Sequence, residues 1–270
     1  MGVIFSNYVN ACKSFWTSNN SSFLPVANPV PRNTNDPDTG FEVAVFNNTS
    51  NGNNNGGYNG GNDNPGGLLI VGCNPSGIAI HRNYRNPNPA IQGSPSIQDF
   101  YTINTFPLKN NNDIYTQAIE DFAKACGYGN HYYKIDVFGI MQKTQSVLRN
   151  DIRKKNCSRI YLYRDLFEIF VDTVIALKPV KIVFANAFVS QLVCDNRNLS
   201  LYDITNSQNY SSIRNNHVHV HSTRNNKGGL DITFCNNGKS LKSTAWFSSM
   251  LSGQRALDLG NKGLLIWAVQ

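Results

Sequence analysis

The stretch Leu68-Leu69-Ile70-Val71-Gly72-Cys73-Asn74-Pro75-Ser76-Gly77 decides the fold of this chain. Its first half is a short apolar run, which is typical of a strand buried in a parallel sheet. The run stops abruptly in a polar turn, and open α/β sheets bind ligands at the carboxyl ends of such strands. We therefore expect Gly72 and Pro75 to fix the backbone and Asn74 and Ser76 to project toward a ligand. An ordinary strand-to-loop turn would use the same residue types.

Strands alternate with helices in the pattern of the remaining chain. Apolar spacing predicts helices over residues 113–126, 163–177, 187–194 and 253–268, and strands over 132–138, 180–185, 216–221, 230–235 and 244–248. Gly127 and Pro179 follow two of these helices as stop signals. The alternation predicts a single three-layer α/β/α domain with a mostly parallel central sheet.

Three regions follow one another along the chain. Residues 1–46 form an N-terminal extension, irregular up to residue 40, that we expect to pack on or beside the domain, and residues 41–46 alternate like a strand. Residues 47–66 are nearly all Asn and Gly, which predicts a flexible insertion, and residues 67–270 form the α/β domain. If strand 41–46 pairs with strand 68–72, the insertion is a hairpin loop.

Composition favours an anionic partner. The 270 residues carry a formal net charge of +7, and 40% of them are hydrophobic. The basic residues fall into three clusters, each of which could equally be a solvated face: Lys143, Arg149, Arg153, Lys154, Lys155 and Arg159; Arg214, Arg224 and Lys227; and Lys239, Lys242, Arg255 and Lys262.

Cysteine and histidine spacing argues against a metal site. The six cysteines are widely and irregularly spaced and form no Cys-x-x-Cys pair, so we expect buried, reduced thiols of an intracellular protein. His217-x-His219-x-His221 places three imidazoles on one strand face, for which solvent exposure is favoured over metal binding. No apolar run is long enough to cross a membrane. We expect neither a metal nor another cofactor.

Gly72-Cys73-Asn74-Pro75-Ser76, at the end of the first parallel strand, resembles the first motif of the uracil-DNA glycosylase superfamily, in its Asn-bearing branches. The resemblance spans residues 68–268. It implies that Asn74 positions the water that attacks the sugar C1′ atom. A carboxamide is less basic than a carboxylate, so Asn74 predicts slow chemistry that depends on electrostatic stabilisation of the leaving base.

A second match is Tyr133-Lys134-Ile135-Asp136-Val137-Phe138, which is similar to the strand whose polar end reads the edge of the flipped base. Several branches have Asn where this chain has Asp136; a strand-end residue that caps a turn is the alternative interpretation. An ionised Asp only accepts hydrogen bonds, whereas Asn also donates. We hypothesise that the substrate is a base with an exocyclic amine and not uracil.

The third match is Phe247-Ser248-Ser249-Met250-Leu251-Ser252-Gly253-Gln254-Arg255, which is similar to the family's His-Pro-Ser motif and minor-groove wedge. Superposition places the motif's serine on Ser249 and its wedge on Leu251, with Met250 as the other apolar wedge candidate. The motif's histidine, which supports the departing anionic base, falls on Phe247, and Phe cannot donate a hydrogen bond. Another donor replaces it, or the base differs, or the protein binds without cleaving. DNA contacts are expected from Ser248, Met250, Leu251, Ser252, Gly253 and Arg255.

Base recognition would complete the site. The resemblance implies that the base lies against Gly72, Cys73, Pro75, Ser76 and Asp136. Phe100 or Tyr101, downstream of the first motif, would stack on it, although both could be ordinary core aromatics.

Three functions follow from these observations. The first is a DNA glycosylase that flips a damaged or modified base and hydrolyses its N-glycosidic bond; it is expected to be monofunctional, because no lysine accompanies the motifs, and to act as a monomer on single- or double-stranded DNA. The second is a protein on the same fold that binds DNA or a modified base without cleaving. The third is an unrelated nucleotide-binding α/β protein.

Overall fold

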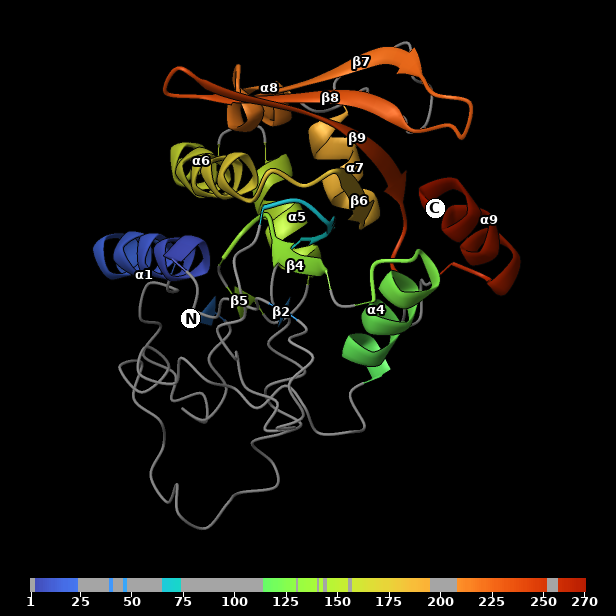
Figure 1. The fold of residues 1–270 in the computed structure, drawn as a ribbon. Coiled ribbons are helices and arrows are strands. Elements are labelled where there is room, and N and C mark those ends of the chain that lie inside the picture. Colours follow the sequence, from blue (N-terminus) through green and yellow to red (C-terminus); the bar gives the residue numbers. More distant parts are fainter. Residues whose placement is uncertain are drawn as a thin grey trace.

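The computed structural model describes residues 3–23, 39–40, 46–47, 65–73, 114–129, 131–139, 141–142, 145–154, 157–194, 208–251 and 257–270. These residues build a seven-stranded mixed sheet in the order β2-β4-β3-β6-β9-β8-β7, with helices on both faces (Figure 1). The predicted three-layer α/β arrangement with a mostly parallel core is therefore confirmed.

Four parallel strands form the centre of the sheet: β4 (Tyr132–Asp136), β3 (Leu68–Gly72), β6 (Lys181–Ala185) and β9 (Lys239–Ser248). Every residue of β3 and β4 is buried, as expected of parallel strands covered on both faces. The chain passes from β3 to β4 on one side and then returns across β3 to β6 on the other. The direction of winding therefore reverses between β3 and β6, and in open α/β sheets such a reversal marks the ligand-binding crevice at the carboxyl ends.

Antiparallel strands flank this centre. β8 (Leu230–Asn236) pairs with β9, and β7 (Val218–Arg224) pairs with β8. β2 (Phe46–Asn47) pairs with β4, and β1 (Thr39–Gly40) pairs with β5 (Met141–Gln142) in a separate small sheet. The condition under which the insertion would be a hairpin loop, a pairing of strand 41–46 with strand 68–72, is not met, because β4 lies between β2 and β3. The Asn/Gly insertion therefore does not join neighbouring strands.

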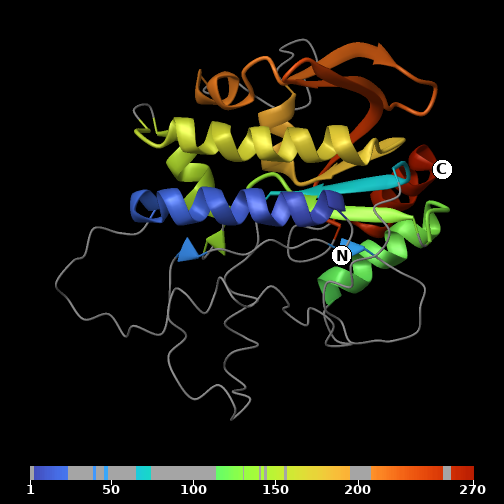
Figure 2. The ribbon, with the colours of Figure 1, turned by 60° about the vertical axis from the view of Figure 1, so that its left-hand side comes forward.

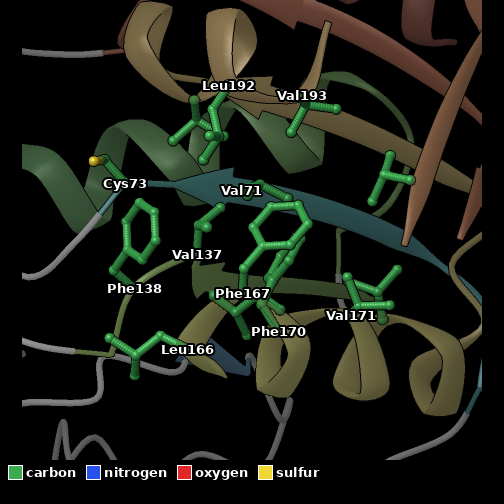
Figure 3. Packing of buried hydrophobic residues seen from close by; sticks show 14 of the residues in the cluster. Val71, Cys73, Val137, Phe138, Leu166, Phe167, Phe170, Val171, Leu192 and Val193 are labelled. Atoms are coloured by element: carbon green, nitrogen blue, oxygen red, sulfur yellow. The ribbon is translucent and has the colours of Figure 1, made fainter. Parts of the chain in front are cut away.

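Five helices cover one face among the described residues. They are α1 (Val3–Phe23), α5 (Gln145–Arg153), α6 (Ile160–Leu177), α7 (Ala187–Val193) and α8 (Gln208–Arg214). Figure 2 shows α1 and α6 lying side by side along the sheet. Phe167 and Phe170 of α6 pack against Val71 of β3 and Val137, which follows β4, in one large apolar cluster (Figure 3).

Helix α1 corrects the expectation of an irregular segment over residues 1–40. Tyr8, Cys12 and Phe15 lie four and three residues apart, so they share one helix face, and all three are buried in the same cluster as α6. The Asn and Ser residues of this segment had hidden that spacing. The core of the domain therefore includes side chains from the N-terminal region.

The opposite face is covered by α4 (Ile114–Ala125) and α9 (Leu259–Val269), which contribute to a second, smaller apolar cluster (Figure 1). Gly127 follows α4 with a φ of 85°, so its predicted role as a helix stop is confirmed. The last helix begins at Leu259 and not near residue 253, because the Asp258 side chain accepts a hydrogen bond from the Asn261 N–H at 2.8 Å and caps the first turn.

The thiols and the helices of the described residues bear on two expectations drawn from composition. All six cysteines are free thiols, and Cys12, Cys73, Cys126 and Cys194 are buried, as expected. Among the described helices, none combines the length and apolar character that a membrane span requires.

Candidate functional site

A row of four residues crosses the carboxyl ends of the parallel strands. It lies on the face of the sheet that packs against α4 and α9. Gly72 of β3 is in register with Asp136 of β4, and Ala185 of β6 is in register with Ser248 of β9. Val71 pairs with Phe184, so Gly72 and Ala185 are the next neighbours along β3 and β6. Strands lie about 4.8 Å apart, and the row from Asp136 to Ser248 is therefore about 14 Å long. Polar side chains stand at both ends, and the two middle residues are small.

Lys134 and Asp136 form a buried ion pair at one end of this row. They are two residues apart on β4 and therefore share a face, with Lys134 Nζ 2.5 Å from Asp136 Oδ2. Each residue is only 3% exposed. Removing charges from water is costly and is tolerated only when they are paired, so neither partner could be removed alone without a large penalty.

Gly72 is required by this pair. A Cβ atom built on Gly72 would lie 2.1 Å from Asp136 Oδ1 and 3.4 Å from Lys134 Cε. The tips of both charged side chains thus meet over Gly72, the last residue of β3, two positions before Asn74 in the sequence. This is a physical reason for glycine at position 72, and it places the ion pair beside the first motif.

Burial sets the electrostatics of the pair. It raises the pKa of the Asp136 carboxyl, and the neighbouring Lys134 ammonium opposes that shift. Burial, together with the Asp136 charge, also raises the pKa of the Cys73 thiol. The Tyr8 hydroxyl donates to the Asp136 backbone carbonyl at 2.8 Å, which ties α1 to the end of β4.

Ser248 stands at the other end of the row. It is 6% exposed, and its hydroxyl is one of the few buried polar groups in the described residues that has no hydrogen-bond partner. Its carbonyl accepts a hydrogen bond from the Ser190 hydroxyl at 3.3 Å. Buried hydroxyls normally have a partner, so this one is available to a bound polar group.

Asn186 directly follows β6 at the same edge of the sheet, and sequence reasoning did not single it out. Its side-chain oxygen accepts from the N–H groups of Phe188 and Val189, at 3.0 and 3.2 Å, and its amide donates to Gln145 Oε1 at 2.9 Å. Both side-chain groups are used, so Asn186 caps α7 and joins it to α5. The sequence signal was present, because Asn before an apolar helix is a common N-cap.

The residues of the third motif differ in their burial. Leu251 is 4% exposed and belongs to the smaller apolar cluster, so it would have to leave that cluster to enter DNA, and its role as a wedge stays a prediction. Met250 and Ser249 are half-buried. Phe247 stacks on Phe184 with ring centroids 5.0 Å apart, and it packs against the large cluster on the opposite face from Ser248.

The described histidines lie away from this edge. His131 precedes β4 at the amino end of the strand, and His217, His219 and His221 lie on or beside β7 at the far end of the sheet. His217 contacts Glu168 Oε1 at 3.1 Å and the Cys235 carbonyl at 3.0 Å, whereas His219 and His221 are exposed, as predicted. No cluster of three metal-ligating side chains occurs in the described part of the chain.

Lys134 corrects a further expectation. The second motif does contain a lysine, and its ammonium contacts the side chain expected to read the base. The absence of a lysine therefore no longer argues for a monofunctional enzyme.

Only part of the basic clusters is available to a polyanion. Arg159 is paired with Asp151 at 2.5 Å, and Arg214 is buried with Nη1 3.4 Å from the Val193 carbonyl. Arg224, Lys239 and Lys242 on β7 and β9 are exposed.

Several residues of the predicted site lie outside the described residues: Asn74, Pro75, Ser76, Phe100, Tyr101, Ser252, Gly253 and Arg255. The described part of the predicted site therefore consists of Gly72, Cys73, Asp136, Ser248, Ser249, Met250 and Leu251, to which the structure adds Lys134.

Comparison with known proteins returned no match: no protein-family model, no curated protein and no solved structure is significantly similar to this chain.

Proposed function

We propose that this protein is a DNA glycosylase that hydrolyses the N-glycosidic bond of a flipped, damaged or modified base. The observation that carries the proposal is the contact of Asp136 with Gly72. It puts a buried, charged side chain beside the strand end that leads into the Gly-x-Asn-Pro-Ser motif, as base recognition next to a water-positioning residue requires. A ligand at this edge also agrees with the reversal of winding between β3 and β6.

The chemistry divides into four roles carried by five residues. Asn74 orients the water that attacks C1′, and the Asp136 carboxylate accepts a hydrogen bond from the edge of the base. Ser249 and the unpartnered Ser248 hydroxyl lie where β9 ends, and they bind the sugar or a flanking phosphate. Met250, which is half-buried, is the apolar side chain that enters the base stack in place of the buried Leu251.

The partner in this proposal is DNA. The net charge of +7 favours a polyanion. The exposed Arg224, Lys239 and Lys242 lie on β7 and the start of β9, so they would contact DNA beyond the base-binding edge. The protein acts as a monomer, and its binding weakens as the salt concentration rises.

A second function is favoured by Phe247. Its ring stacks in the core on Phe184, so this position offers no hydrogen-bond donor to a departing base. A protein that holds a modified base in the same place without cleaving it is the alternative.

A panel of oligonucleotides tests the proposal. Single- and double-stranded substrates carrying uracil, hypoxanthine, xanthine, hydroxymethyluracil or hydroxymethylcytosine are incubated with wild-type protein, with Asn74→Ala and with the control Asn261→Ala on α9. Alkali-sensitive cleavage by wild type and the control, lost in Asn74→Ala, is expected. Salt-dependent binding without cleavage would favour the binding protein, and neither binding nor cleavage would leave a nucleotide-binding α/β protein with another substrate.

A further inference from the structure

Glycosidic hydrolysis leaves a charge that the protein must stabilise. Water forms the new bond to C1′, the C1′–N bond breaks, and its electron pair stays on the base, which then takes up one proton as the water gives one up. Negative charge therefore develops on the base in the transition state. Removing one preorganised donor aimed at such a charge slows an enzyme by about 100- to 1000-fold.

Described residues near this edge offer few groups for that task. Phe247 has no donor, His131 lies at the opposite end of β4, and the histidines of β7 are separated from β3 by β6, β9 and β8. The Asn186 amide is already used to cap α7 and to contact Gln145.

Lys134 brings a cation to the required place. Its side chain runs along β4 toward the carboxyl end, Nζ contacts Asp136 Oδ2, and Cε lies over Gly72. We propose that Lys134 is the catalytic cation that stabilises the departing base anion, and that Asp136 orients its ammonium group. This assignment rests on the proposed glycosylase function and deepens it.

The environment of the ammonium supports this assignment. A lysine that is 3% exposed has little water around it, so its charge acts on a neighbouring anion with little screening. Asp136 uses one oxygen for Lys134 and keeps the ammonium at a fixed position, which avoids reorganisation during the reaction. A buried ion pair is weak evidence for stability alone, because apolar residues of similar volume stabilise a core as well or better.

The acidity of the leaving base separates a catalytic from a structural role. Single-turnover excision is measured on matched pairs of oligonucleotides that cover every base of the panel. They are uracil and hydroxymethyluracil, each with 5-fluorouracil, hypoxanthine with xanthine, and hydroxymethylcytosine, which carries an exocyclic amine, with 5-fluorocytosine. In each pair the second base leaves as the more stable anion and needs less help. Lys134→Met should slow excision of the first base by about 100-fold or more and that of the second by a markedly smaller factor. Lys134→Arg should retain part of the rate.

Two controls keep the test decisive. Lys181→Met alters a lysine at the amino end of β6, and it should leave the ratio within each pair unchanged. If Lys134→Met does not fold, the double variant Lys134→Gln with Asp136→Asn replaces the ion pair by an uncharged amide pair, and it should show the same steeper dependence on leaving-group acidity.

The outcomes separate a failure of the Lys134 assignment from a failure of the glycosylase function. Equal slowing of both bases in a pair, or no slowing, would overturn the role of Lys134 while leaving the glycosylase function in place. Cleavage of none of these bases by wild type would overturn the glycosylase function and the lysine assignment with it.

Discussion

The two ends of the parallel strands use their polar side chains differently. At the amino end, Lys181 Nζ donates to the backbone carbonyls of Val269 and Gln270, the latter at 3.0 Å, so the lysine caps the last turn of α9. The Gly66 N–H donates to the Leu177 carbonyl at 2.9 Å, and the Leu68 N–H to the His131 carbonyl at 3.1 Å. The first two contacts tie the ends of α9 and α6 to the sheet, and the third joins β3 to the start of β4.

At the carboxyl end, the polar groups do not all serve the backbone. The Lys134 ammonium pairs with the buried Asp136 carboxylate, and the Ser248 hydroxyl has no hydrogen-bond partner. The same parallel strands therefore carry differently used polar groups at their two ends. The comparison indicates that the amino end is structural and that the carboxyl end is organised for a ligand, as the direction of parallel strands favours.

The largest effect is expected from Gly72→Ala. The added methyl group would overlap Asp136 Oδ1, so the ion pair must shift, at a cost of about 1–3 kcal/mol in the free energy of unfolding. Excision should be lost as well. Urea denaturation measures the first effect. Gly263→Ala on α9 is the control: its Cβ would meet no atom within 4 Å, and it should stabilise the protein by about 0.5–1 kcal/mol. A Gly72→Ala variant as stable and active as wild type would contradict the placement of the pair.

A smaller effect is expected from Lys181→Met. The variant loses the hydrogen bonds to the end of α9, which should reduce the free energy of unfolding by about 1 kcal/mol. Excision by the folded variant should stay close to the wild-type rate, because the change lies at the structural end. Urea denaturation and the oligonucleotide assay check the two halves of this prediction, and a loss of activity without a loss of stability would break the comparison.

The pH dependence of stability should carry the signature of Asp136. The folded protein raises the pKa of this carboxyl, so it binds a proton that the unfolded chain has already released. Stability should therefore fall as the pH rises from about 4, the ordinary Asp value, through the raised pKa of the folded state. Tyr8 and Cys73, the acidic neighbours of Asp136, have raised pKa values and stay neutral throughout this window.

Asp136→Asn should remove that slope, although the unpaired Lys134 would lower stability at every pH. Unfolding curves between pH 4 and 7 make the comparison. An unchanged slope in Asp136→Asn would show that another group titrates there.

No covalent intermediate with the DNA is expected. Borohydride should not trap wild-type protein on an oligonucleotide with an abasic site, because an ammonium held by Asp136 has no lone pair with which to attack C1′. Gel electrophoresis detects the trapped complex. A covalent adduct that disappears in Lys134→Met would make Lys134 a nucleophile, and the enzyme would then also be a lyase.

Much of the fold could be predicted from local patterns. The apolar run of β3, the helical spacing of α6 and the Gly127 stop each depend on a few neighbouring residues, and each is confirmed. The pairing of β2 with β4 could not be predicted, because which strands become neighbours depends on contacts between distant parts of the chain.

The described site was harder to predict for a related reason. Asp136 was selected because the resemblance aligns it with the residue that reads the base. Lys134 was not selected, because an alternating lysine is common in strands, and only the sheet brings its tip over Gly72. Leu251 was selected as a wedge from the resemblance, and its burial in one apolar cluster with Ala268 and Val269 of α9 depends on contacts between distant parts of the chain. The unpartnered Ser248 hydroxyl can be recognised only from its surroundings.

The two lysines carried by β4 and β6 separate the two ends of the sheet most directly. The decisive measurement is the single-turnover rate of abasic-site formation by wild type, Lys134→Met and Lys181→Met on the base that wild type excises fastest. We predict that Lys134→Met loses about 100-fold or more, whereas Lys181→Met stays near wild type. Equal rates in the two variants, or a larger loss in Lys181→Met, would contradict the claim that the carboxyl end of the sheet is the active end.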